Sequence, residues 1–171
     1  MPSSTPKYGL PFPVLGDPPN GPVGIQNLAT AADALGILGG KMLVTPSAAI
    51  STIETIVVDT QTLSLPANSV FQLDFHVTFT ASVAGNDITM NVRLTSVSGT
   101  IIGSGTAEGV YVSPQPNYGH ISMLYKTTVT ELDYFCASVV RVGAGTGTVS
   151  VIAPTSLVVT CLGPSTIIGN Y

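Results

Sequence analysis

Apolar and polar residues alternate along most of the chain from Lys41 onward, and this pattern predicts β-strands. In the clearest stretch, residues 71–83 (FQLDFHVTFTASV), every second side chain is apolar and those between are polar. Successive side chains of a strand point to opposite faces, so this strand is expected to cover a core with one face. Residues 88–97 repeat the pattern, and their expected core face consists of Ile88, Met90, Val92 and Leu94.

Turn sequences separate further apolar runs at intervals of about 8–15 residues, which is typical of an antiparallel sandwich. The glycine-rich residues 143–147 are expected to form a hairpin turn, since they lack the lysine of a phosphate-binding loop and precede a strand. The fold class predicted is all-β, an antiparallel β-sandwich of jelly-roll type, spanning residues 41–165 with residues 166–171 as a tail. Other expected strands are 41–45, 53–65, 100–112, 119–130, 133–142, 148–153 and 156–162.

Residues 1–24 form a different kind of segment, with seven prolines among them. Proline disfavours helices and central strands, so an extended arm is expected. The arm also carries apolar side chains, which suit an arm that lies in a groove on a neighbouring protein. A flexible terminal tail is the alternative. The expected anchors of the arm are Tyr8, Leu10, Phe12, Val14 and Leu15.

Residues 25–40 are expected to contain one short helix. Its apolar side chains are spaced by three and four residues, as on one face of a helix, and Gly39-Gly40 would end it. So short a helix is marginal alone and needs a partner, which is either its own sandwich or copies of itself in a trimeric bundle. The side chains expected on this self-association face are Ile25, Leu28, Ala32 and Leu35.

The composition is unusually poor in charge, because only 8% of residues are charged while 44% are hydrophobic. Either threonine, serine and asparagine supply the polar surface, or subunits cover one another; both are expected to act together. The five Lys and Arg residues are scattered and the net charge is −4, which excludes a clustered nucleic-acid-binding face. No membrane span and no secretion signal are expected from the sequence.

Candidate chemistry is sparse. His76 and Asp74 share one face of a strand, but two ligands are too few for a zinc site, so a surface histidine near a carboxylate is expected. No nucleophile motif or phosphate loop is recognisable, so no catalytic residue, metal or cofactor is expected and the protein is interpreted as a non-enzyme. Cys136 and Cys161 are expected to be buried free thiols, with a disulfide left open.

Two segments resemble a known group of proteins. RVGAGTGTVSVIAPTSLVVTCLGP (residues 141–164) resembles the closing strands of β-sandwich domains in tailed-phage virion proteins, with Thr160-Cys161 in place of their acidic pair. YGLPFPVLGDPPNGPVGIQNLATAADAL (residues 8–35) resembles the N-terminal segment of minor virion proteins from phages that infect actinobacteria.

The resemblance implies a C1q/TNF-like head that assembles as a homotrimer. In such trimers, aromatic residues of one sheet meet at the threefold axis. Ordinary core aromatics are the alternative for the same residues. The candidates for that interface are Tyr111, Tyr118, Tyr125, Tyr134 and Phe135.

The function expected is therefore that of a virion structural protein, a trimeric minor tail or fibre-type component docked by its arm. A capsid decoration protein or head fibre is the first alternative and a carbohydrate-binding module the second. The partners expected are copies of the chain itself and other tail or capsid proteins. A host-surface glycan is a further candidate partner.

Overall fold

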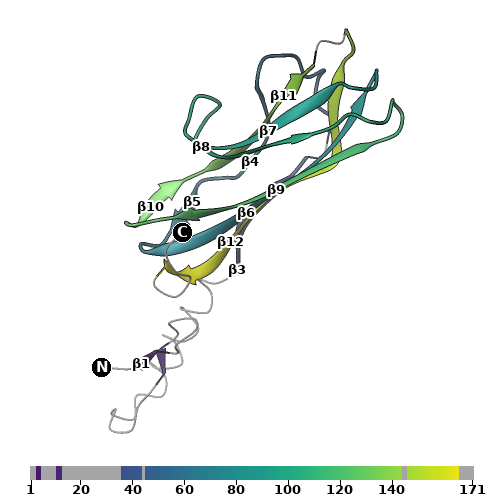
Figure 1. Ribbon diagram of the computed structural model, residues 1–171. Coiled ribbons are helices and arrows are strands. Elements are labelled where there is room, and N and C mark those ends of the chain that lie inside the picture. The colour runs from purple at the N-terminus through teal and green to yellow at the C-terminus, as the bar shows by residue number, and fades with distance from the viewer. Residues whose placement is uncertain (1–2, 5–10, 13–35, 44, 144–145, 166–171) are drawn as a thin grey trace.

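The computed structural model describes residues 3–4, 11–12, 36–43, 45–143 and 146–165. Eight of the described strands form one β-sandwich (Figure 1). They are β3 (Gly36–Met42), β4 (Thr55–Asp59), β6 (Ser69–Ala81), β7 (Asp87–Leu94), β8 (Ile101–Ala107), β9 (Asn117–Lys126), β11 (Phe135–Val142) and β12 (Val149–Pro164). Two short antiparallel pairs are separate from its two sheets: β1 (Ser3–Ser4) with β2 (Pro11–Phe12), and β5 (Leu63–Leu65) with β10 (Glu131–Asp133).

Two four-stranded antiparallel sheets pack face to face. One has the order β3-β12-β6-β9 and is called the β6 sheet; the other has the order β4-β11-β7-β8 and is called the β7 sheet. When the eight strands are counted in chain order, the first sheet contains strands one, eight, three and six, and the second contains strands two, seven, four and five. This order defines a jelly roll. The all-β jelly-roll sandwich predicted from the alternation is therefore confirmed.

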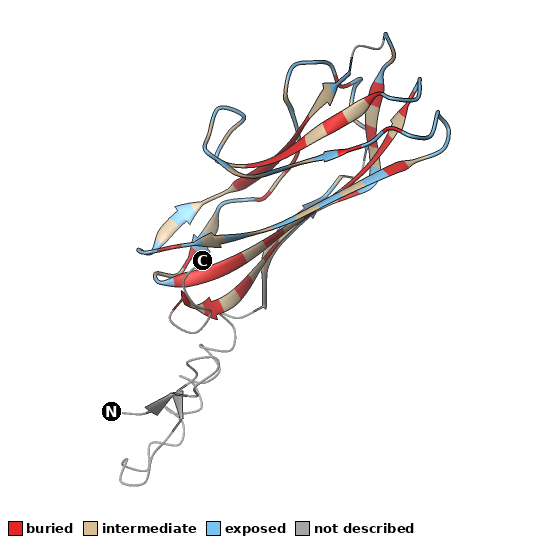
Figure 2. Cartoon of the chain, in the orientation of Figure 1, coloured by how far each residue is buried: buried red, intermediate tan, exposed pale blue. Residues whose placement is uncertain are grey.

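The core lies between the sheets, where buried positions of both sheets face each other (Figure 2). Phe71, Leu73, Phe75 and Phe79 of β6 are fully buried, as the alternation predicted. Ile88, Met90 and Val92 of β7 oppose them, also with almost no exposed surface. Val83, predicted to continue the core face, is instead 48% exposed, because β6 ends at Ala81.

Residues 36–40 correct the expected helix. They form most of β3, which pairs antiparallel with β12, so the sandwich extends at least to Gly36 rather than beginning at residue 41. Gly40 allows the two strands to approach closely, since a Cβ atom there would lie 2.8 Å from the carbonyl oxygen of Leu157. The remainder of the expected helix, residues 25–35, lies outside the described residues. The expected tail, residues 166–171, also lies outside them.

The connections also differ from expectation. Residues 143–147 lead from β11 in the β7 sheet to β12 in the β6 sheet, so the expected hairpin turn is a crossing between sheets. The two strands expected at 148–153 and 156–162 are one strand, β12, which carries a register shift between Ile152 and Ser156. β12 lies inside its sheet, between β3 and β6.

Candidate functional site

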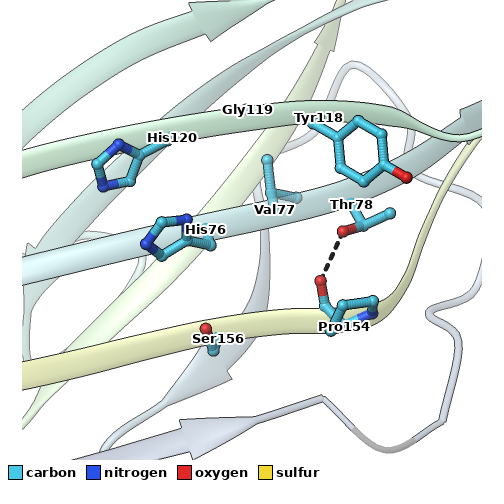
Figure 3. Close-up of a pocket in the computed structure, with 8 residues that line it drawn as sticks. All are labelled: His76, Val77, Thr78, Tyr118, Gly119, His120, Pro154 and Ser156. Atoms are coloured by element: carbon cyan, nitrogen blue, oxygen red, sulfur yellow. Dashed lines mark hydrogen bonds between the residues drawn. The ribbon is translucent and has the colours of Figure 1, made fainter.

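A hollow with a volume of about 450 Å³ opens on the outer face of the β6 sheet, above β9, β6 and β12 (Figure 3). Thr78 lies at its floor and is buried. Side-chain rings form the walls of this hollow, which is called the ring-walled hollow. They are the aromatic rings of Tyr118, His120 and His76 and the saturated ring of Pro154.

Strand register places these side chains. His76 lies opposite His120, and Thr78 lies opposite Tyr118, on the neighbouring strands β6 and β9. Alternation keeps all four on the outer face, because Val77 between them points into the core. On the other side of β6, Ser156 of β12 lies opposite His76 and completes the row.

Two threonines fix the irregular part of β12 beside the hollow. The Thr78 hydroxyl donates to the carbonyl oxygen of Pro154 at 2.6 Å, and the Thr155 hydroxyl donates to that of Ile152 at 2.7 Å. The Thr155 oxygen also accepts the backbone N–H of Thr78 at 2.9 Å. These bonds replace the ladder bonds lost at the register shift, so the Pro154 wall is held in a defined position.

The two imidazole rings stack. Their centroids are 4.1 Å apart and their planes differ by 13°. Asp74 lies 3.6 Å from Nε2 of His120 and accepts two hydrogen bonds from the amide of Gln72. Burial alone would raise the pKa of Asp74, but the hydrogen bonds from Ser122 and Gln72 and the neighbouring His120 outweigh it, so the pKa is lowered.

A second polar cluster lies on the outer face of the β7 sheet. The Glu54 carboxylate accepts from Nε and Nη2 of Arg93, both at 2.7 Å, from the Asn91 amide at 2.9 Å and from the Ser138 hydroxyl. The hydrogen bond from Arg93 is the main cause that lowers the pKa of Glu54 to about 2, against the opposing effect of burial. These hydrogen bonds connect the segment before β4 to β7 and β11, and both oxygens of the Glu54 carboxylate accept at least one of them.

The aromatic residues predicted for a trimer interface do not gather on one face. Tyr118 is 69% exposed on the β6 sheet and Tyr111 is 56% exposed in the loop before β9. Phe135 is fully buried between the sheets, where the Tyr125 ring meets it edge to face at 5.3 Å. Tyr134 is half-buried. Phe135 therefore fills the core of one chain, and Tyr125 packs beside it.

The other predicted site residues have separate outcomes. Tyr8, Leu10, Val14 and Leu15 of the arm lie outside the described residues, and of Phe12 the structure describes only its place in β2. The helix residues Ile25, Leu28, Ala32 and Leu35 also lie outside them. Cys136 and Cys161 are free and buried, as expected, and burial raises the pKa of both thiols.

Within the described ranges, no cluster of three or more histidine, cysteine, aspartate or glutamate side chains is placed to hold a metal ion. In the same ranges, no helix has the length and apolar character that a bilayer span requires.

Sequence reasoning missed Pro154, Ser156 and Met42 as parts of the outer face. Ala153-Pro154-Thr155 interrupts the alternation of the last strand, and this break was the available signal. It was interpreted as a gap between two strands, whereas β12 runs through it.

Together, the strand order and the exposed ring-walled hollow define a jelly-roll β-sandwich domain with a surface hollow on one sheet. No protein-family model matches the chain, and no curated protein sequence matches it. Solved structures with a similar strand arrangement include a chain of infectious bursal disease virus, Gt strain, at 14% identity and a TM-score of 0.49, covering 71% of this chain and 32% of the viral chain.

Two further solved structures also have a similar strand arrangement. The VP2 subviral particle of infectious bursal disease virus matches at 13% identity and a TM-score of 0.49, over 74% of this chain and 32% of VP2. Eiger TNF from S. frugiperda matches at 7% identity and a TM-score of 0.46, over 73% of this chain and 92% of Eiger. This chain thus spans about a third of the length of the viral chains.

Proposed function

We propose that the chain is a non-enzymatic structural protein of a tailed-phage virion, a minor tail or fibre-type component. It assembles as a homotrimer and docks on its neighbours through residues 1–24. The observation that carries this proposal is a jelly-roll sandwich in a chain with only 8% charged residues. A surface so poor in charge is suited to lasting contact with other subunits. The resemblance of residues 8–35 and 141–164 to phage virion proteins supports the same role.

The arm supplies the docking mechanism. Its apolar residues, among them Tyr8, Leu10 and Phe12, would be buried in a groove of a neighbouring virion protein. At about 25 cal/mol per Å² of apolar surface, a few such side chains contribute several kcal/mol per arm. Three arms on one trimer add avidity, because the second and third docking events are intramolecular.

Deletion of residues 1–24 tests this mechanism. We expect the truncated protein to remain folded, because the sandwich core begins after the arm, and to be lost from particles. Phage propagated with the truncated gene would be purified, and the protein quantified per particle by mass spectrometry. Circular dichroism of the isolated protein controls for folding. Wild-type occupancy of particles by the truncated protein would contradict arm docking.

The same particles distinguish the tail from the capsid. Immunogold labelling on the tail or its tip supports the tail component. Labelling distributed over the shell instead identifies a capsid decoration protein or head fibre, the alternative left open by the arm.

A further inference from the structure

We infer that the outer face of the β6 sheet is the self-association surface of the chain, and that its occupant is a second copy of the same chain. The inference deepens the proposed function and rests on it, because it assigns to one face the contact between subunits. The ring-walled hollow lies within this face.

Large apolar side chains are exposed on this face. Tyr118 is 69% exposed, Met42 is 58% exposed and Leu124 is 40% exposed. Register places Met42 opposite Ser156 and Leu124 opposite Gln72, so these residues share the side of the sheet that the hollow occupies. Exposed aromatic and aliphatic side chains around a hollow are typical of the centre of a protein interface.

Charge favours a copy of the same chain as the occupant. Among the outward positions of the described parts of β3, β12, β6 and β9, the only residues with a formal charge at pH 7 are Asp74 and Lys126. The formal charges of these two residues sum to zero on this face, whereas the whole chain has a net charge of −4. Electrostatic repulsion between identical copies is therefore weak when they meet through this face.

The two charges are also placed so that copies can pair them. Asp74 lies opposite Ser122, and Lys126 is four residues further along β9, about 13 Å away at the rise of a strand. A rotated neighbour can therefore bring its Lys126 to Asp74, and in a closed ring of three copies each chain gives one such contact and receives one. The face is complementary to itself in charge as well as apolar in character.

The area of the outer face of the β6 sheet is close to that of a specific protein interface. Four strands at about 4.8 Å spacing and about 33 Å in length present roughly 600 Å² of sheet. A specific interface buries about 800 Å² on each partner, so this face, with part of its surrounding loops, is sufficient. The outer face of the β7 sheet is less suitable, because the ion pair of Glu54 with Arg93 lies on it.

The ring-walled hollow gives the contact a fixed position. Its volume of about 450 Å³ admits an apolar side chain of a neighbouring copy, and three of its walls are aromatic rings whose faces pack well against such a group. Thr78 at the floor has its hydroxyl bonded to Pro154, so covering the hollow leaves this hydroxyl with a partner.

The test replaces Tyr118 by lysine and uses Leu132→Lys as the matched control. Leu132 is 73% exposed but belongs to β10, which pairs with β5 outside the β6 sheet. Masses of the full chains would be measured by light scattering and sedimentation equilibrium across a range of concentrations. We expect wild type and Leu132→Lys to form the same oligomer and Tyr118→Lys to dissociate at least tenfold more readily.

Folding is controlled by circular dichroism, and Leu124→Lys provides a second variant on the same face. Equal masses for wild type and both face variants would overturn the inference. A wild type that is monomeric at every concentration would overturn it too. If such a monomer bound neutral oligosaccharides and lost them on Tyr118→Lys, the hollow would be a glycan site instead. The deletion of residues 1–24 tests docking on other virion proteins separately. Docking by the arm and self-association through the β6 sheet can therefore be contradicted independently of each other.

Discussion

Glu54 connects strands that are distant in sequence through one carboxylate. Arg93 and Asn91 from β7 and Ser138 from β11 all donate to it, while Glu54 itself precedes β4. Its side chain is 18% exposed, so water competes only partly with these bonds. Removal of its charge therefore leaves the Arg93 guanidinium group without a counter-charge on the face of the sheet.

We expect Glu54→Gln to lower the free energy of unfolding at pH 7 by about 2 kcal/mol, as is typical for breaking a largely buried charge-assisted pair. Urea denaturation would measure the loss, and Glu108→Gln, at an exposed position, is the control. Equal stability of the two variants would show that the cluster contributes nothing net.

The same pair sets a pH dependence. The folded-state pKa of Glu54 is about 2, below its ordinary 4.5, so its contribution is present above about pH 4.5 and is lost as the pH falls towards 2. The difference between wild type and Glu54→Gln should therefore shrink across that range.

Residue-scale burial was largely predictable from sequence, since Phe71, Phe75 and Phe79 occupy the core as their alternation indicated. The environment of Tyr125 was not predictable. Its neighbour Phe135 comes from the other sheet. Burial, together with the hydrogen bond that the Tyr125 hydroxyl donates to Glu131, raises the pKa of Tyr125 to about 12. Such contacts depend on how the sheets face each other, which local alternation does not encode.

Among the elements, β12 combines regular pairing with several register shifts, one of which lies between Ile152 and Ser156. Thr155 is fully buried there, and its oxygen accepts the N–H of Thr78 across the strands. This hydroxyl substitutes for the ladder partner that the register shift removes.

Thr155→Val is expected to destabilise the protein by about 1–3 kcal/mol, because the buried N–H of Thr78 then lacks an acceptor. Thr160→Val, a change of the same size at a half-buried position of the same strand, should have a smaller effect. Thermal or urea unfolding of both variants measures the difference. Equal losses would mean that the threonine hydroxyl at the bulge is dispensable.

The positions of the strands were easier to predict from the sequence than the strands with which each one pairs. The stretches 84–87 and 143–147 have the residues of tight turns, yet each leads from one sheet to the other. In a jelly roll, most consecutive strands lie in different sheets, so a turn sequence does not show whether its flanking strands pair. The stretch 36–40 was misassigned because its glycines resemble a helix stop, whereas pairing with β12 makes it a strand.

At the scale of the whole molecule, the low charge and the exposed apolar face of the β6 sheet favour the proposed assembly. A helix was predicted from the sequence within residues 25–40, of which residues 25–35 lie outside the described residues. In the proposed assembly it would supply a second contact between copies, in addition to the β6 sheet. The two contacts would then be separable by mutation, because they belong to different parts of the chain.

We expect Leu28→Asp or Leu35→Asp to weaken self-association by placing a charge on the proposed helix face, without unfolding the sandwich. Light scattering at several concentrations would report the change in mass relative to the 17.5 kDa chain. Asp33→Asn, which adds no charge, is the control. An unchanged mass for both leucine variants would remove the helical contact and leave the sheet alone.

The position of β12 has a consequence for synthesis. This strand lies between β3 and β6, yet it follows every other described strand in the chain. During translation, the edges of β3 and β6 that pair with β12 remain unpaired until residues 149–164 leave the ribosome. The sandwich therefore closes late, and a nascent chain halted before Val149 would be a substrate for chaperones and proteases rather than a partly finished domain.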